Sequence, residues 1–416
     1  MNSIAFPLPA AERGAALLIF VLALLCVLLG GFLGRLNSAP PSAEREARTD
    51  SALTQARDAL IGFAATYRDT HANQVFGYLP CPDNDNDGDA DLSCGKANVS
   101  VVGRLPWKTL GLPPLRDGSG ECLWCALSGN AKDTAKTAVY NWDTPGQFVI
   151  HGAGGTPLAG ADAHQRPLAV IFAAQSPLAA QSRTAASTSP CGGGNAADYL
   201  EGLGTLGTGD TTIVVADADS IRNGRNNDRA TWITSKDIFD RVKGRSDFKT
   251  DVDTLINEFA DYLNGLPADS LPSASPGASK GMQAVLKRYN DDNRSLPKYK
   301  ANLLANWEDN LLYAGGPDGH YSVNGGACRC RALLIFGGER TTRAVAPLVA
   351  QTRASAAEKG SATGFGDPAM YLEGSAAALF PGEGNYAGAS QYDPAHPDAD
   401  IIRCINGREA PPAVQP

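Results

Sequence analysis

An uncharged apolar run near the N-terminus constrains this 416-residue chain more than any other feature of its sequence. The run follows Arg13-Gly14 directly, covers residues 15–34 and ends at Arg35. About twenty residues at about 1.5 Å each span about 30 Å, the thickness of a bilayer core. A secretory signal would have a shorter apolar core and a small-residue cleavage site, and the candidates ending at Ala39 and Ala43 fit poorly. We therefore expect a transmembrane helix over residues 15–34.

The junction of a charged segment, a glycine and an apolar run resembles the class III leader of type IV pilins and type II secretion pseudopilins. In that family a prepilin peptidase cuts after the glycine, and the apolar helix remains as a membrane anchor and as the packing core of a filament. The resemblance implies a leader at residues 1–14, a cut between Gly14 and Ala15, and an N-methylated mature chain. It also implies the inner membrane and other pilin or pseudopilin subunits as partners. Ile19 stands where the family usually has Glu, which resembles minor subunits at a filament tip. A plain single-pass anchor is the alternative.

Composition limits the function classes that the rest of the chain supports. The net charge of −8 and the absence of a basic stripe argue against a nucleic-acid-binding surface. About 380 residues follow the anchor, enough for two or three domains. No sequence motif of a hydrolase, metalloprotease or nucleotide-binding enzyme is present. We therefore do not expect an enzyme.

Eight cysteines follow the apolar run, an even number that favours disulfides in an oxidising compartment, here the periplasm. Cys81 and Cys94 are expected to pair because they bracket one compact acidic loop. Cys122 and Cys125 lie in a strand-like stretch, where their side chains would point to opposite faces, so a direct bond between them is disfavoured.

A separate prediction concerns the remaining four cysteines. Cys328 and Cys330 are expected to clamp a C-terminal lobe together with Cys191 and Cys404. Zinc is the alternative for this group, but an oxidising compartment favours disulfides.

Periodicity predicts an α+β fold. Apolar residues at helical spacing predict an amphipathic helix from Ser42 to about Arg68, and strands are expected at 147–151 and 167–173. The segments Leu79–Asp83 (LPCPD) and Gly103–Leu112 (GRLPWKTLGL) are similar to segments of large pilin-like proteins of proteobacteria. That resemblance implies a helix packed on an antiparallel sheet.

Breaks in the periodicity of apolar residues divide the chain into regions. A helical insert is expected to open at Ser235, and its later helices are expected at 279–289 and 299–313. The expected regions are a leader at 1–14, a transmembrane helix at 15–34, a pilin-like α+β periplasmic domain at 42–230, a helical insert at 231–315, a C-terminal lobe completing the sheet at 316–407, and a disordered tail at 408–416.

A weak internal duplication spans the insert. The apolar run 166–172 is followed by Tyr199-Leu200-Glu201-Gly202, and the run 331–336 is followed by Tyr371-Leu372-Glu373-Gly374. Two related strands in one sheet, two duplicated lobes and chance similarity all remain open.

The sharpest local signal is an acidic loop with an aspartate at every second position, Asp83, Asp85, Asp87, Asp89 and Asp91. Oxygen ligands at this spacing, with a glycine at position 88, suit Ca²⁺. A full EF-hand is excluded because Cys94 occupies the position of the last glutamate. The alternative is a solvated acidic turn. We expect a structural calcium loop, because five aspartates repel one another without a cation.

These observations favour a minor, tip-located pilin or pseudopilin subunit of a type IV pilus or type II secretion system. Its role would be assembly, with a head stabilised by calcium and disulfides. The alternatives are a membrane-tethered periplasmic enzyme and an adhesin or binding protein that uses a pilin-like leader.

Overall fold

The computed structural model describes most of the chain in nine stretches. These are residues 18–25, 42–136, 140–183, 189–274, 280–326, 329–341, 350–353, 355–360 and 366–406. The chain divides into two compact units, Met1–Arg48 and Thr49–Pro416, so the boundary falls inside the first long helix. The expected tail at 408–416 lies outside the described residues.

The N-terminal apolar segment corrects the first expectation. The described helix in this segment covers only residues 18–25. Eight residues rise about 12 Å, well short of a bilayer core of about 30 Å. Within the described stretches, none of the helices combines the length and the apolar character needed to cross a membrane. The predicted transmembrane helix over 15–34, and with it the single-pass inner-membrane localisation, is therefore wrong.

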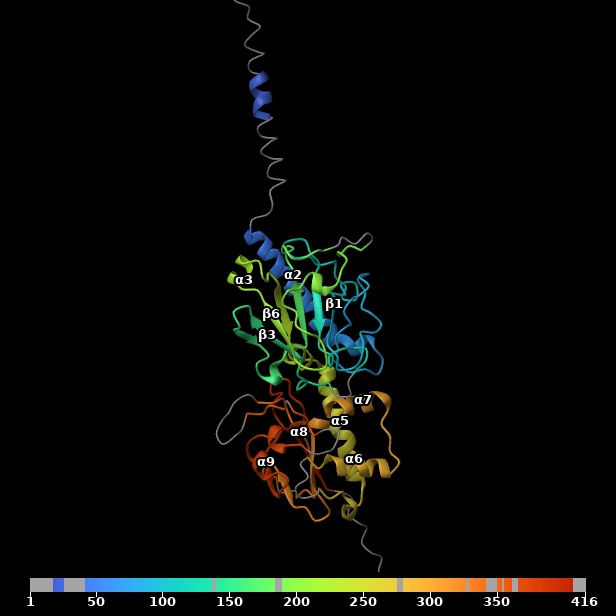
Figure 1. The fold of residues 1–416 in the computed structure, drawn as a ribbon. Helices are drawn as coiled ribbons and strands as arrows, with labels where there is room; N and C mark the ends of the chain where they lie inside the picture. The colour runs from blue at the N-terminus through green and yellow to red at the C-terminus, as the bar shows by residue number, and fades with distance from the viewer. Residues whose placement is uncertain are drawn as a thin grey trace, which may run out of the picture. The chain divides into compact units, whose positions relative to one another are not determined.

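The first lobe, residues 42–233, begins with the predicted amphipathic helix. This helix, α2, runs over Ser42–Thr70. Its buried face includes Leu53, Leu60 and Ile61, which share one core with residues of the strands. Figure 1 shows α2 alongside these strands. The other elements are β1 (Val101–Arg104), β2 (Trp124–Leu127), β3 (Phe148–Gly152), β4 (Pro157–Ala159), β5 (Ala169–Ala173), β6 (Thr211–Val215), α3 (Ala218–Arg222) and β7 (Arg229–Ile233).

Two sheets build this lobe. The strands β1, β2, β5 and β7 form an antiparallel sheet in that order. A smaller sheet has the order β4-β3-β6, in which β3 and β6 are parallel. The helix-on-antiparallel-sheet arrangement that the resemblance implied is thus present in the first lobe.

The helical insert, residues 235–307, follows. Its elements are α4 (Ser235–Val242), α5 (Ser246–Gly265), α6 (Met282–Asp291) and α7 (Lys298–Trp307). The side chain of Thr234 caps α4 by accepting from the Asp237 N–H. Helices α2 and α5 are tied by ion pairs, Arg68 with Asp251 and Arg245 with Asp69.

The second lobe, residues 311–405, repeats the strand pattern of the first. Its elements are β8 (Leu311–Gly315), β9 (Tyr321–Val323), β10 (Ala332–Phe336), α8 (Ala356–Lys359), α9 (Gly374–Leu379), β11 (Gly384–Tyr386) and β12 (Ile401–Ile405). Strands β8, β10 and β12 form an antiparallel sheet with β10 in the centre, as β5 is central between β2 and β7. The parallel pair β9–β11 corresponds to the parallel pair β3–β6.

The two antiparallel sheets share the same register at their strand ends. In each sheet the first residue of the central strand pairs with the last residue of both neighbours: Ala169 with Leu127 and Ile233, and Ala332 with Gly315 and Ile405. Because a slip of one residue would turn every side chain to the opposite face, this agreement in two separate sheets indicates a duplicated lobe.

Two regional expectations change accordingly. The C-terminal lobe does not complete the first sheet, because β8, β10 and β12 form a three-stranded sheet of their own. The first expected boundary, at 230/231, lies inside β7, and the second, at 315/316, lies directly after β8. The helix expected over 299–313 ends in the structure at Trp307, and residues 311–313 belong to β8 instead. Strand β8 is buried throughout except at Gly315, and this packing overrides its helical periodicity.

Candidate functional site

The acidic loop is closed at its base by the predicted Cys81–Cys94 disulfide. Within it, the Asp83 carboxylate accepts hydrogen bonds from three backbone N–H groups, those of Asn86 (2.6 Å), Asp87 (3.2 Å) and Gly88 (2.8 Å). Gly88 has φ +95°, a left-handed conformation that favours glycine. The loop is therefore wrapped around Asp83, which is 1% exposed.

Three of the five predicted metal ligands converge. Oxygen atoms of Asp83, Asp85 and Asp91 all lie within 4.8 Å of one another. Calcium–oxygen bonds of about 2.3–2.6 Å place two ligands of one ion at most about 5 Å apart, so this donor set fits a single cation. Asp87 and Asp89 do not join the group. Asp87 accepts from the N–H of Asp89, whose own side chain pairs with a lysine, Lys108, at 3.5 Å.

Burial perturbs the central carboxylate. Desolvation raises the pKa of Asp83 to about 6, although the N–H groups of Gly88, Asn86 and Asp87 act to lower it. A cation beside Asp83 would favour its charged form and offset this desolvation. The carboxylates are therefore suited to a hard, oxygen-preferring cation, and their chemistry does not distinguish Ca²⁺ from others of that kind.

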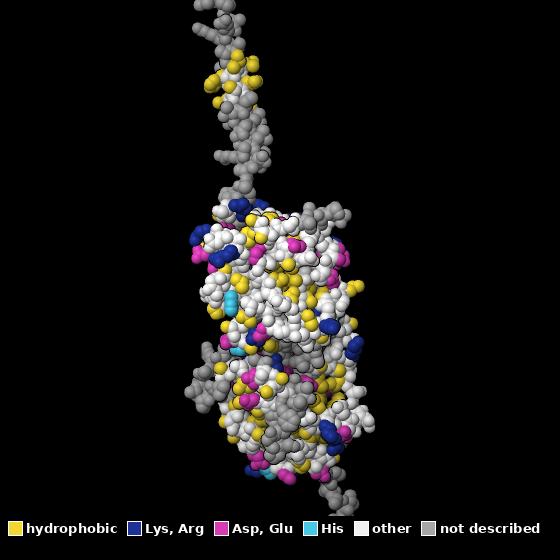
Figure 2. Space-filling view, in the orientation of Figure 1, with side chains coloured by type: hydrophobic (Ala, Val, Ile, Leu, Met, Phe, Trp, Pro, Cys, Tyr) yellow, Lys and Arg dark blue, Asp and Glu magenta, His cyan; other side chains and the backbone are white. Residues whose placement is uncertain are grey.

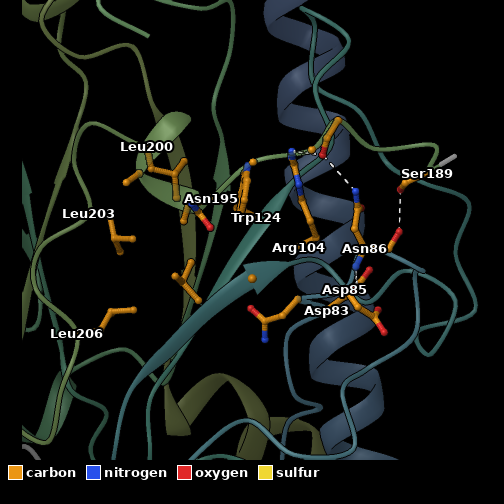
Figure 3. Close-up of a pocket in the computed structure, with 18 of the residues that line it drawn as sticks. Asp83, Asp85, Asn86, Arg104, Trp124, Ser189, Asn195, Leu200, Leu203 and Leu206 are labelled. Atoms are coloured by element: carbon orange, nitrogen blue, oxygen red, sulfur yellow. Dashed lines mark hydrogen bonds between the residues drawn. The ribbon is translucent and has the colours of Figure 1, made fainter. Parts of the chain in front are cut away.

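A cavity of about 930 Å³ adjoins the loop (Figure 3). Asp83 and Asp85 line one side and Leu200 and Leu203 line the other, with Arg104 between them. The Arg104 guanidinium is buried and donates to the carbonyl oxygens of Cys122 and Gly192 at 3.1 and 3.0 Å. The cavity thus has an acidic wall, an apolar wall and a buried cation that already donates to two backbone carbonyls.

The disulfides confirm part of the cysteine prediction. Cys122 bonds Cys191, and Cys125 is free and buried, so the two residues of the C-x-x-C motif do not pair with each other. The expectation that Cys191 clamps the C-terminal lobe is therefore wrong. Cys330 bonds Cys404 within the second lobe.

Three of the predicted site residues cannot be placed. Gly14 and Ala15, the expected leader junction, lie outside the described residues, and so does Cys328.

The sequence reasoning missed a hydrogen-bonded cluster in the first lobe. Gln181 donates to the Tyr199 carbonyl (3.1 Å) and to the Glu201 carboxylate. Arg183 donates to Gln181 Oε1 at 2.6 Å and lies over the Tyr199 ring at 4.8 Å. Asp228, directly before β7, accepts from the N–H of Gly202 at 3.1 Å. The cluster joins the Tyr-Leu-Glu-Gly turn to the sheet.

The second lobe contains the same cluster with equivalent residues. Gln351 donates to Glu373 Oε1 at 2.8 Å, and Arg353 donates to Gln351 Oε1 at 2.9 Å. Arg353 lies over the Tyr371 ring at 4.3 Å, and Asp400 accepts from the Glu373 N–H at 3.3 Å. The sequence signal that could have revealed the two clusters is a Gln-x-Arg pair ahead of each Tyr-Leu-Glu-Gly segment.

Each cluster places a buried aspartate near a half-buried glutamate. Burial, and then the neighbouring Glu201 carboxylate, raises the pKa of Asp228 to about 7. Burial and the Glu373 carboxylate likewise raise the pKa of Asp400 well above its ordinary value. The clusters are consequently stabilised when one carboxyl of each pair is protonated.

Comparison of the chain with protein-family models, with curated proteins and with solved structures finds no match.

Proposed function

We propose that the chain is a structural subunit of a pilin-like assembly, a minor and tip-located member of a type IV pilus or type II secretion machine. The observation that carries this proposal is the apolar helix at residues 18–25, ahead of the long helix α2. Leu18, Ile19 and Phe20 expose 66%, 69% and 68% of their surfaces. Figure 2 shows hydrophobic side chains gathered on the described part of this N-terminal segment. Burial of one such side chain contributes about 1.5–3 kcal/mol, so packing against like helices of neighbouring subunits would stabilise the assembly.

The first lobe supports the same proposal. Helix α2 packs on an antiparallel sheet, the arrangement that the resemblance to pilin-like proteins implied. Three disulfides brace the described part of the head and suit a compartment that keeps cysteines oxidised. Ile19, in place of the usual glutamate of the resembled family, suits a subunit with no further subunit above it.

In this proposal, the acidic loop holds one Ca²⁺ through Asp83, Asp85 and Asp91. The ion would offset two of the three negative charges and hold Asp83 and Asp85 to Asp91 at the other end of the loop. The remaining ligands would be carbonyl or water oxygens, because Ca²⁺ takes six to eight. Its role is structural.

The leader is tested by the mass of the mature N-terminus. The full chain is produced with and without a prepilin peptidase, and the N-terminal peptide is analysed by mass spectrometry. A start at Ala15 that requires the peptidase is the expected result. A start at Met1 in both samples, or a cut after Ala39 or Ala43, contradicts the proposal.

The assembly role is tested by a charge on the exposed helix. Leu22 is 59% exposed, and Leu22→Glu should remove the chain from the sheared filament fraction because a buried charge is costly. Leu92→Glu is the matched control, because Leu92 is 96% exposed in the acidic loop. Equal incorporation of both variants would argue against helix packing.

A further inference from the structure

The apolar wall of the cavity beside the acidic loop is built by one turn of the first lobe and the residues that follow it. Leu200, Leu203 and Leu206 line this wall (Figure 3). Leu200 belongs to the Tyr-Leu-Glu-Gly turn at 199–202, whose Gly202 carbonyl accepts from the N–H of Val214 in β6 at 2.8 Å. The shape of the cavity therefore depends on the groups that hold this turn.

On its other side the turn is held by a fully buried carboxyl group. The Gly202 N–H donates to Asp228 Oδ2 at 3.1 Å, and Asp228 is 0% exposed. Its Oδ1 has no hydrogen-bond partner among the described residues. The turn itself carries a second carboxyl group, that of Glu201, which lies 3.5 Å from the backbone N–H of Asn227. Two carboxyl groups thus hold the turn to the residues directly before β7.

No cation is dedicated to this pair. The charged side chains that act on Asp228 are Glu201 and, with the opposite sign, Arg183. The Arg183 guanidinium donates to backbone carbonyls and to Gln181 Oε1, and it lies 3.4 Å from the Glu121 carboxylate. In the described part of the chain, none of these hydrogen bonds reaches Asp228 or Glu201. A buried carboxylate without an ion pair, close to a second carboxylate, is costly, so the closed turn favours one bound proton.

We propose that loss of this proton to water releases the turn, and with it the apolar wall of the cavity. With two negative charges, repulsion between the carboxylates and the missing hydration of Asp228 both favour a local opening that admits water. Burial and Glu201 raise the pKa of Asp228 to about 7, above its value in an open, hydrated turn. The closed wall is therefore favoured below neutral pH and is lost as the pH rises through 7. This switch goes beyond the assembly role and does not depend on it.

The second lobe supplies an internal comparison. There Asp400 accepts from the Glu373 N–H at 3.3 Å, so the equivalent turn at 371–374 is held by an equivalent pair. Neither residue lines the cavity beside the acidic loop. If each pair controls its own turn, a change in one lobe should leave the turn of the other lobe unaffected.

The test is hydrogen–deuterium exchange of the full chain at pH 6 and pH 8, read by mass spectrometry and corrected for the intrinsic exchange rate. Protection of residues 199–206 in the parent should fall about tenfold between the two pH values, because each pH unit above the pKa changes the opening equilibrium by up to tenfold. Asp228→Asn keeps an oxygen for the Gly202 N–H and should abolish this fall. Asp400→Asn, the matched control, should keep the fall in 199–206 and abolish the one in 371–374.

A second variant keeps the proposal testable if Asp228→Asn does not fold, which urea unfolding reveals. Glu201→Gln removes the other carboxylate and should also reduce the fall in 199–206. Three results overturn the proposal. They are constant protection of 199–206 in the parent, a fall that persists in both Asp228→Asn and Glu201→Gln, and a fall of equal size in the core strands β2 and β5, which would show global instead of local opening.

Discussion

Replacing Asp228 by asparagine should stabilise the protein above neutral pH. Asp228 is 0% exposed, and its Oδ1 has no hydrogen-bond partner in the part of the chain that the structure describes. Burial and the Glu201 carboxylate raise its pKa from 3.8 to about 7. Because the folded pKa lies above the unfolded one, this group's contribution to stability is complete below about pH 4 and is lost as the pH rises through 7.

The structure sets the size of the effect. A difference of about three pKa units at about 1.36 kcal/mol each gives an upper limit of about 4 kcal/mol above pH 7. Asparagine is neutral and keeps an oxygen for the Gly202 N–H, but its amide donors need new acceptors. We therefore expect Asp228→Asn to raise the free energy of unfolding at pH 8 by about 2 kcal/mol.

The assay is urea unfolding followed by tryptophan fluorescence at pH 4.5 and pH 8. Asp400→Asn, the equivalent change in the second lobe, should act in the same direction because burial and Glu373 raise the pKa of Asp400 too. Exposed Asp269→Asn serves as the neutral control. An Asp228→Asn variant that is less stable than the parent at pH 8, or that keeps the parent's loss of stability between the two pH values, refutes the reasoning.

Three further predictions concern the acidic loop and the buried arginine. Calcium at about 1 mM, which is in the affinity range of extracellular calcium loops, should raise the melting temperature of the parent and of Asp89→Asn. It should not raise that of Asp85→Asn, which lacks a ligand. An equal rise in all three proteins would argue against the site. The Cys81→Ser, Cys94→Ser double variant should lose about 3 kcal/mol of unfolding free energy in urea, as expected for a short closed loop, and an unchanged urea midpoint would show that this bond does not brace the head. Arg353→Met should cost about 3 kcal/mol in the same assay, because it removes the closer of the two arginine partners of the buried Asp143 carboxylate and leaves only Arg340. A neutral result would mean that the Arg353–Asp143 ion pair does not hold the lobes together.

Features set by nearby residues could be predicted from the sequence. Helical spacing predicted α2 and α5, whose bounds Ser42–Thr70 and Ser246–Gly265 the structure gives. Cys81–Cys94 could be paired because only 13 positions separate the two residues across one loop. The alternating aspartates likewise identified the acidic loop, although only the folded loop selected Asp83, Asp85 and Asp91 from the five.

Features that join distant residues could not be predicted in the same way. Cys122–Cys191 spans 69 positions, and eight cysteines allow 105 connectivities, so spacing could not select it. The apolar composition of residues 15–34 indicated a full membrane span, whereas the described helix covers only residues 18–25. The sequence by itself therefore determined the amphipathic helices, the acidic loop and the two ends of each repeat. Only the tertiary structure showed that the repeats are separate lobes and that Trp142, Asp143 and Arg340 line one cavity. Both features depend on packing between segments far apart in the chain, which local periodicity does not describe.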